Sequence, residues 1–124
     1  MDAFYRRYLE RCNQHRFEDL GEFVDPEVQV NGVPTGLDQY IAGLQSVVEA
    51  FPDYYWDLQH LLVDGDWLSA HLIDTGTHTG TFLTIPATGR TITAQEFALY
   101  RITNNKITAC WGDLDSAVHH QLTR

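Results

Sequence analysis

The sequence contains little of what several specialised protein classes require. It has only 2 cysteines, Cys12 and Cys110, and no CxxC or Cys/His finger spacing, which argues against a disulfide framework and a zinc finger and favours two reduced thiols. Lys and Arg number 8 against 17 Asp and Glu, so the net charge is −9 at pH 7. Nucleic acids and anionic membranes bind cationic surfaces, so we expect neither as a partner.

Long apolar segments are also missing. No run of about 18 apolar residues occurs, and the first residues, MDAFYRRYLERC, have no apolar signal core. We therefore expect a cytoplasmic protein without a membrane anchor. A length of 124 residues with 44% hydrophobic residues is enough for one domain, spanning residues 1–124, that buries its own core.

Apolar residues at helical spacing predict helices in the first half of the chain. Residues 2–14 place aromatic residues on one face and charged residues on the other, and a short helix is expected over residues 17–24, ending before Pro26. The segment EVQVNG alternates and predicts a short strand. Residues 36–51 form one long apolar stripe that Pro52 ends, which predicts the longest helix.

After Pro52 the period changes from 3.6 to 2. The expected strands are Tyr54–Asp64, Trp67–Thr77, Thr91–Thr103 and Lys106 to about Leu114. Asp64-Gly65-Asp66 and Asn104-Asn105 predict hairpin turns, and the last ten residues predict a short helix. Helices followed by a strand meander indicate an α+β fold, in which a curved antiparallel sheet encloses a pocket between itself and the helices.

The segment GTHTGTFLTIPATGR, residues 76–90, is longer than a hairpin connection needs. Such a long loop between two central strands is expected at the rim of the pocket, where it can close over a ligand. His78 would then lie at the entrance.

Several short motifs follow one another in a recognisable order. They are FPD at 51–53, GTHTG at 76–80, IPATGR at 85–90, YRI at 100–102, K-I at 106–107 and W-x-x-x-D at 111–115. With these motifs the chain resembles the SnoaL-like polyketide cyclases and ester cyclases of the nuclear-transport-factor-2-like superfamily, which have a cone-shaped α+β fold.

The resemblance implies small-molecule chemistry inside the cone, typically an intramolecular aldol ring closure with an aspartate as general acid and base and with no metal or cofactor. An ungapped comparison places the family's catalytic aspartate on Gly112, and its neighbouring Gln and His positions on Glu96 and Ala98. His78 and Asp115 match the family directly. We also expect a homodimer that packs its sheets together.

Glu96 is the first candidate for an acid or base. On its face of the predicted strand it lies between Ala94 and Ala98, which leave open volume, and an apolar wall raises the pKa of a carboxyl towards the useful range. Alternatively, Glu96 lies on an exposed face or pairs with Arg90 or Arg101.

The positions of Asp113 and Asp115 depend on the last hairpin. A two-residue turn would place Ile102 opposite Ile107 and bring Asp113 and Asp115 to the face of Glu96, as a carboxylate cluster. A three-residue turn would shift the strand by one residue, so that Cys110 and Gly112 share that face instead. Asp115 could equally cap the final helix.

The remaining candidates would bind the substrate. His71 and His78 could donate a hydrogen bond to a carbonyl or shuttle a proton, or be satisfied structural residues, and none of the 6 histidines has metal-ligand spacing. Asn31 could bind a substrate carbonyl or only serve its turn. The aromatic candidates for hydroxyl donors and substrate walls are Tyr8, Tyr100 and Trp111, with core packing as the alternative for Tyr8.

The interpretation we favour is cofactor-independent proton transfer on a small, apolar, oxygenated molecule, with polyketide-type cyclisation as the leading example. Epoxide opening or another hydrolysis or isomerisation is a second option, and it would need an Asp-Arg-Asp arrangement such as Asp113, Arg101 and Asp115. The third is a non-catalytic ligand-binding or dimerisation module, which Gly112 favours because it lacks the family's acid.

Overall fold

The computed structural model describes residues 1–123 and begins with the predicted amphipathic helix. Helix α1 spans Asp2–Asn13 and buries its aromatic face in the core. The expected second helix is shorter and is a 3₁₀ helix, η1, over Phe17–Glu22. Strand β1, Val24–Val30, starts before Pro26, and its pairing is irregular between Val24 and Gln29 because proline has no N–H to donate to the ladder.

Asn31 and Gly32 both have positive φ angles, 53° and 79°, and make the tight turn that leads into β2, Val33–Pro34. This two-residue strand was not predicted. Helix α2, Leu37–Ala50, follows and ends directly before Phe51 and Pro52, as the sequence predicts.

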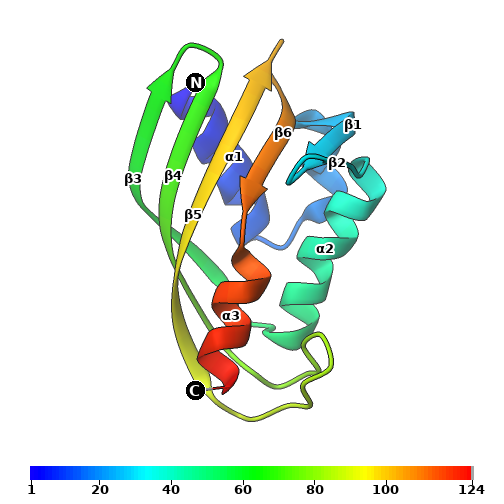
Figure 1. The fold of residues 1–124 in the computed structure, drawn as a ribbon, viewed down its shortest axis with the longest axis vertical. Helices are drawn as coiled ribbons and strands as arrows, with labels where there is room; N and C mark the ends of the chain where they lie inside the picture. Colours follow the sequence, from blue (N-terminus) through cyan, green and yellow to red (C-terminus); the bar gives the residue numbers. More distant parts are fainter. Residues whose placement is uncertain (124) are drawn as a thin grey trace.

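The remaining strands are β3, Tyr55–Asp64, β4, Trp67–Thr77, β5, Thr91–Thr103, and β6, Lys106–Gly112. The sheet order is β2-β1-β6-β5-β4-β3, antiparallel except for the β1–β6 pair. Figure 1 shows the long strands bending around the helices, with helix α3, Leu114–Thr123, against β5. The predicted α+β cone is confirmed, although the sheet is curved and not closed into a barrel.

The last hairpin combines features of both predicted registers. Asn104 and Asn105 have φ angles of 53° and 58°, which makes a two-residue turn with Ile102 opposite Ile107. The register then shifts between Arg101 and Ile102, so that Tyr100 pairs with Cys110 and Ala98 with Gly112. A β-bulge after the two-residue turn therefore shifts β6 by one residue. The resulting register is the one that we predicted for a three-residue turn.

The loop between β4 and β5 does not lie where we expected it. Its base continues the strand ladder, because the N–H of His78 donates to the Arg90 carbonyl at 2.8 Å and the N–H of Gly89 donates to the His78 carbonyl at 2.8 Å. Its Phe82 is buried against Phe51, with ring centroids 5.6 Å apart. Figure 1 shows the loop at the end of the molecule where α3 ends, so it closes the core there rather than the ligand pocket.

No helix in the described part of the chain combines the length and apolar character needed to cross a membrane.

Candidate functional site

A cavity of about 450 Å³ lies between the concave face of the sheet and all three α-helices. This volume is in the range of small-molecule sites. The cavity is lined by Tyr5, Tyr8, Leu9, Cys12, Val30, Asn31, Thr35, Gln39, Tyr40, Gly43, Leu44, Val47, Trp56, Leu72, Glu96, Ala98, Tyr100, Cys110, Trp111, Gly112, Asp113, Leu114, Asp115 and Ser116. Among the described residues, the cavity has no Lys, Arg or His side chain in its lining.

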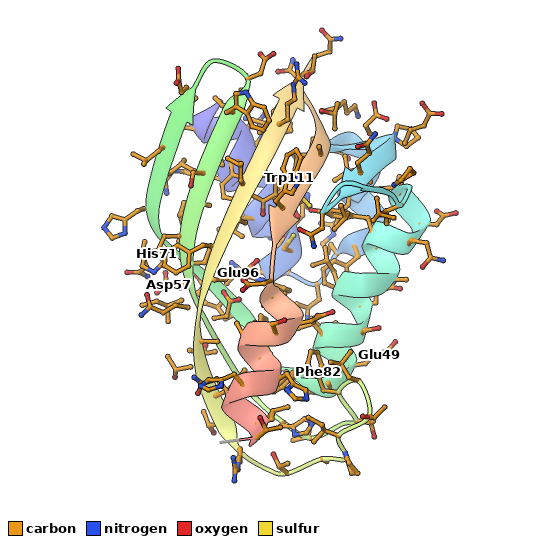
Figure 2. All side chains as sticks on the ribbon, in the orientation of Figure 1. Glu49, Asp57, His71, Phe82, Glu96 and Trp111 are labelled. Carbon is orange, nitrogen blue, oxygen red and sulfur yellow. The ribbon has the colours of Figure 1, made fainter. Side chains whose placement is uncertain are left out.

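Glu96 enters this cavity because of the strict alternation of β5. The inward residues from Ile92 to Ile102 are buried and the outward ones are exposed, so the carboxyl has the same direction as the core side chains. Only 8% of Glu96 is exposed, and the adjacent Ala98 lines the cavity with it. Figure 2 shows Glu96 in the middle of the molecule, close to the start of α3. The prediction of an inward carboxyl between small residues is confirmed, and the surface alternative is wrong.

Burial raises the pKa of Glu96 well above its ordinary value. The neighbouring Asp74 raises it further, by a hydrogen bond and by its charge, and the charge of Asp113 acts in the same direction. A hydrogen bond from the Trp56 indole, which stabilises the carboxylate, acts against this shift. Since no cationic side chain lines the cavity within the described residues, Glu96 is an acid that keeps its proton to unusually high pH.

Asp74 was missed by the sequence analysis. It has 0% exposure and does not line the cavity. Strand pairing places Leu72 opposite Glu96 and Asp74 opposite Ala94, so the two carboxyls are diagonal neighbours on the inner face. The sequence does contain a signal, because Asp74 continues the inward apolar row of Leu68, Ala70 and Leu72, where an acidic residue is exceptional.

Asp113 and Asp115 reach the site by a different route from the one predicted. Strand β6 ends at Gly112, so the pairing of Asp113 with Glu96 across the hairpin does not form. Both residues nevertheless line the cavity, from the start of α3. Partial burial raises the pKa of Asp115. The two aspartates are more exposed than Glu96, which places them at the mouth of the cavity.

Four tyrosines supply most of the hydroxyl groups in the cavity. The hydroxyls of Tyr8 and Tyr40 are 2.6 Å apart, and the Tyr5 hydroxyl donates to that of Tyr100 at 3.2 Å. Burial raises the pKa of all four, so they stay neutral and can donate a hydrogen bond to a ligand oxygen. The prediction that Tyr8 and Tyr100 face the pocket is confirmed, while Tyr5 and Tyr40 were expected only as apolar-stripe residues of their helices.

The two cysteines also face the cavity as free thiols. Burial raises the pKa of Cys12 to about 12 and that of Cys110 to about 11. Neither is therefore a thiolate nucleophile at neutral pH.

The two candidate histidines, His71 and His78, do not line the cavity. His78 is fully buried outside the cavity, where its Nδ1 accepts from the Thr88 N–H at 3.1 Å and its ring stacks on Phe51. His71 faces outwards because odd-numbered residues of β4 lie on the convex side, and Figure 2 shows it at the outer side of the sheet. There it contacts His60 at 3.0 Å and Gln95 at 2.6 Å.

Asn31 and Trp111 both border the cavity, but their side chains have different partners. Asn31 lines it, and its Oδ1 accepts from the Gly112 N–H at 3.0 Å, which joins the β1–β2 turn to the end of β6. The Trp111 ring packs against that of Trp67, with centroids 5.7 Å apart, because residue 111 pairs with the outward Leu99. Trp111 still borders the cavity, and Trp56, which is buried beside Glu96, adds a second indole that the sequence did not predict.

The arrangement needed for epoxide opening does not form. Arg101 is exposed, with its guanidinium 5.6 Å from the centre of the Trp67 ring and not in the cavity. Within residues 1–123, no three His, Cys, Asp or Glu side chains are grouped closely enough to hold a metal ion.

The fold and the site together define a cone-shaped α+β protein with a small-molecule cavity around one buried carboxyl. The family model of the SnoaL-like polyketide cyclases matches residues 2–121. The chain therefore belongs to the SnoaL-like polyketide cyclase family, and this membership supports a cyclase or isomerase role.

Individual relatives agree with this assignment. The chain is 27% identical over 110 residues to the aklanonic acid methyl ester cyclase DnrD of Streptomyces peucetius, covering 82% of this chain and 75% of that protein. A SnoaL-like polyketide cyclase from Agrobacterium tumefaciens has a solved structure with a TM-score of 0.85 and 32% identity, covering 98% of this chain and 96% of the other. TsrD from Streptomyces laurentii has a TM-score of 0.86 at 23% identity, covering 98% and 93%, and so shares the fold.

Proposed function

We propose that this protein catalyses cofactor-independent proton transfer on a polyketide-type ester in the cavity, and that the reaction is an intramolecular aldol ring closure. The observation that supports this most is Glu96, a buried carboxyl with raised pKa that borders a cavity of about 450 Å³. The curated relative acts on a methyl ester, as its name states. An aromatic β-keto ester that carries a second ketone is the corresponding substrate class.

The cavity residues have two roles in this reaction: Glu96 transfers protons, and tyrosine hydroxyls donate hydrogen bonds. Glu96 accepts the proton from the acidic carbon between two carbonyl groups and later returns a proton to the new alkoxide oxygen. The donors for the enolate oxygen are tyrosine hydroxyls, in particular Tyr8 and Tyr40. They take the role that the sequence analysis gave to the two histidines. Leu44, Val47 and the aromatic rings form the apolar walls.

Gly43 offers a way to test whether the reaction takes place in the cavity. It lies in α2 and lines the cavity, and a Cβ added there would meet no atom within 4 Å. We therefore expect Gly43→Phe to fold and to obstruct the cavity, lowering kcat/KM for a synthetic aromatic β-keto methyl ester by about 10–200-fold. The measurement is ring closure by mass spectrometry, together with deuterium uptake at the acidic carbon in D₂O.

The matched control is Ala42→Phe, which adds a phenyl ring at the adjacent exposed position of α2 outside the cavity lining. It should turn over like the wild type. If both phenylalanine variants are as active as the wild type, the chemistry is not in this cavity. If the wild-type protein binds the ester but neither cyclises it nor exchanges its acidic hydrogen, the protein is a binding module.

We propose further that the outer face of the sheet pairs with a second copy of the chain. Large apolar side chains are exposed on it, with Leu62 71% exposed, Phe97 62% and Tyr55 50%, and Trp67 and Trp111 add a pair of indole rings. Large apolar side chains exposed on one face of a sheet are typical of an interface. A homodimer in which the two sheets face each other would cover this face.

Phe97→Glu should convert this dimer into monomers, because it buries a charge in the centre of the apolar face. Light scattering after size-exclusion chromatography measures the mass directly. Leu83→Glu adds the same charge at an exposed residue of the 78–90 loop and should remain dimeric. A wild-type protein that is monomeric at micromolar concentration, or a Phe97→Glu variant that stays dimeric, would contradict the proposal.

A further inference from the structure

Behind Glu96 lies a second carboxyl, that of Asp74, which the cavity does not reach. Asp74 has 0% exposure and does not line the cavity, whereas Glu96 does. Strand pairing makes the two carboxyls diagonal neighbours, close enough for a hydrogen bond once one of them carries a proton. On its other side Asp74 is held by Tyr54, whose hydroxyl donates to Asp74 Oδ2 at 2.8 Å. Asp74 can therefore influence a ligand only through Glu96.

The two carboxyls have too few donors for both to be ionised. Asp74 Oδ1 and Glu96 Oε1 are both buried, and neither accepts a hydrogen bond from any N–H or O–H group. A proton held between the two groups supplies the missing hydrogen bond. Two adjacent buried carboxylates repel each other, and such pairs share one proton.

The groups around the pair do not change this conclusion. The titratable neighbours are Tyr5 and Cys12 of α1, Tyr54 directly before β3, Tyr100 of β5, Cys110 of β6, and Asp113 and Asp115 at the start of α3. These neighbours are neutral hydroxyls and thiols or further carboxyls. None of them is a cation that could neutralise a second negative charge.

The direction in which the proton is held follows from the same contacts. The hydrogen bonds that Asp74 accepts from Tyr54 and from Glu96 lower the pKa of Asp74 against the effect of its burial, whereas the bond to Asp74 raises that of Glu96. The resting pair is therefore a protonated Glu96 that donates to an ionised Asp74. A protonated Glu96 cannot act as a base unless another group accepts its proton.

We propose that Asp74 is the positioning residue for proton transfer by Glu96: it receives the Glu96 proton while Glu96 takes a proton from the substrate, and it gives that proton back later. The inference rests on the proposed function, in which Glu96 is the group that contacts the substrate. It adds that the acid–base unit is a pair of carboxyls with one shared proton.

The steps balance without any other reactant. The C–H bond of the substrate breaks, its proton moves to the Glu96 oxygen that faces the cavity, and the proton between the carboxyls passes to Asp74, leaving the electron pair on the substrate as an enolate. The enolate carbon then forms a C–C bond with the ketone carbon, whose π electrons move to its oxygen. Glu96 protonates that oxygen, and Asp74 returns its proton to Glu96. The pair ends as it began, with one proton.

The test is the titration of both carboxyls by ¹³C NMR in the full-length protein, with labelled Asp and Glu. In the wild type, the Asp74 and Glu96 resonances should each report the same two midpoints, because coupled groups titrate as a pair. In Asp74→Asn, Glu96 should show one midpoint, lower than the upper wild-type one by about one pH unit or more. Because the singly protonated pair is the active form, the acid limb of kcat/KM for the β-keto ester should follow the lower midpoint in the wild type and the single Glu96 midpoint in Asp74→Asn.

Asp57→Asn is the matched control, because Asp57 is exposed on the same sheet at the edge strand β3, and it should change neither titration nor rate profile. Independent single midpoints for the two wild-type carboxyls would overturn the inference even if Asp74→Asn fails to fold. An unchanged Glu96 midpoint and pH profile in a folded Asp74→Asn variant would overturn it as well. In either case the proposed function stands as long as Glu96→Gln abolishes turnover, so the two failures are distinguishable.

Discussion

Replacing Glu96 with glutamine should lower kcat for ring closure of the β-keto ester by about 10²–10⁴-fold. Glutamine has the same shape and can still hydrogen-bond to Asp74, but it cannot accept a proton from carbon. We expect KM to change little, because the tyrosines and the apolar walls that hold the ligand are untouched. The measurement is steady-state kinetics on the variant after circular dichroism has shown it to be folded.

Asp113→Asn and Asp115→Asn are the comparison for this result. Both remove a carboxyl from the cavity lining, but at the more exposed mouth. Their effects on kcat should be much smaller than that of Glu96→Gln. A folded Glu96→Gln variant with nearly wild-type kcat, or an aspartate variant with the larger loss, would assign the chemistry to the mouth of the cavity instead.

Phe82→Ala should lower the free energy of unfolding by about 3–5 kcal/mol. Phe82 is only 2% exposed, and it packs on Phe51 at the closed end of the cone. Removing the ring leaves a hole that the 78–90 loop cannot fill, because its base is fixed by the hydrogen bonds between His78, Gly89 and Arg90. Since a domain has a net stability of about 5–15 kcal/mol, urea denaturation will show the loss clearly.

Leu83→Ala is the control at the next position, where the side chain is 57% exposed. It should change the stability by no more than about 0.5 kcal/mol. The KM of the folded Phe82→Ala protein should equal that of the wild type, because no residue of this loop lines the cavity. A Phe82→Ala protein of normal stability but altered KM would instead support our original expectation of a lid.

The architecture follows from local patterns that the sequence displays directly. Strands β4 and β5 have the predicted bounds because each alternates inward and outward residues over its whole length. The same alternation placed Glu96 correctly between Ala94 and Ala98. These features can be predicted from the sequence of a single strand, without knowing which strand pairs with it.

What the sequence could not predict depends on contacts between distant segments. The bulge in β6 changes the register without leaving a mark in the turn residues. The positions of His78 and Phe82 depend on how the 78–90 loop packs against α2. Asp74 could have been identified from its inward apolar row, but its role as a partner of Glu96 follows only from the pairing of β4 with β5.

The most direct test of this account is the protonation midpoint of Glu96 in the unliganded wild-type protein, measured by ¹³C NMR between acidic and neutral pH. Desolvation in the cavity and the adjacent Asp74 predict that the upper midpoint, at which Glu96 loses its proton, lies well above the pKa of about 4.3 for a free glutamate. A Glu96 carboxyl that titrates near that free value would show that the cavity is wet and the acid ordinary, and would contradict the mechanism proposed here.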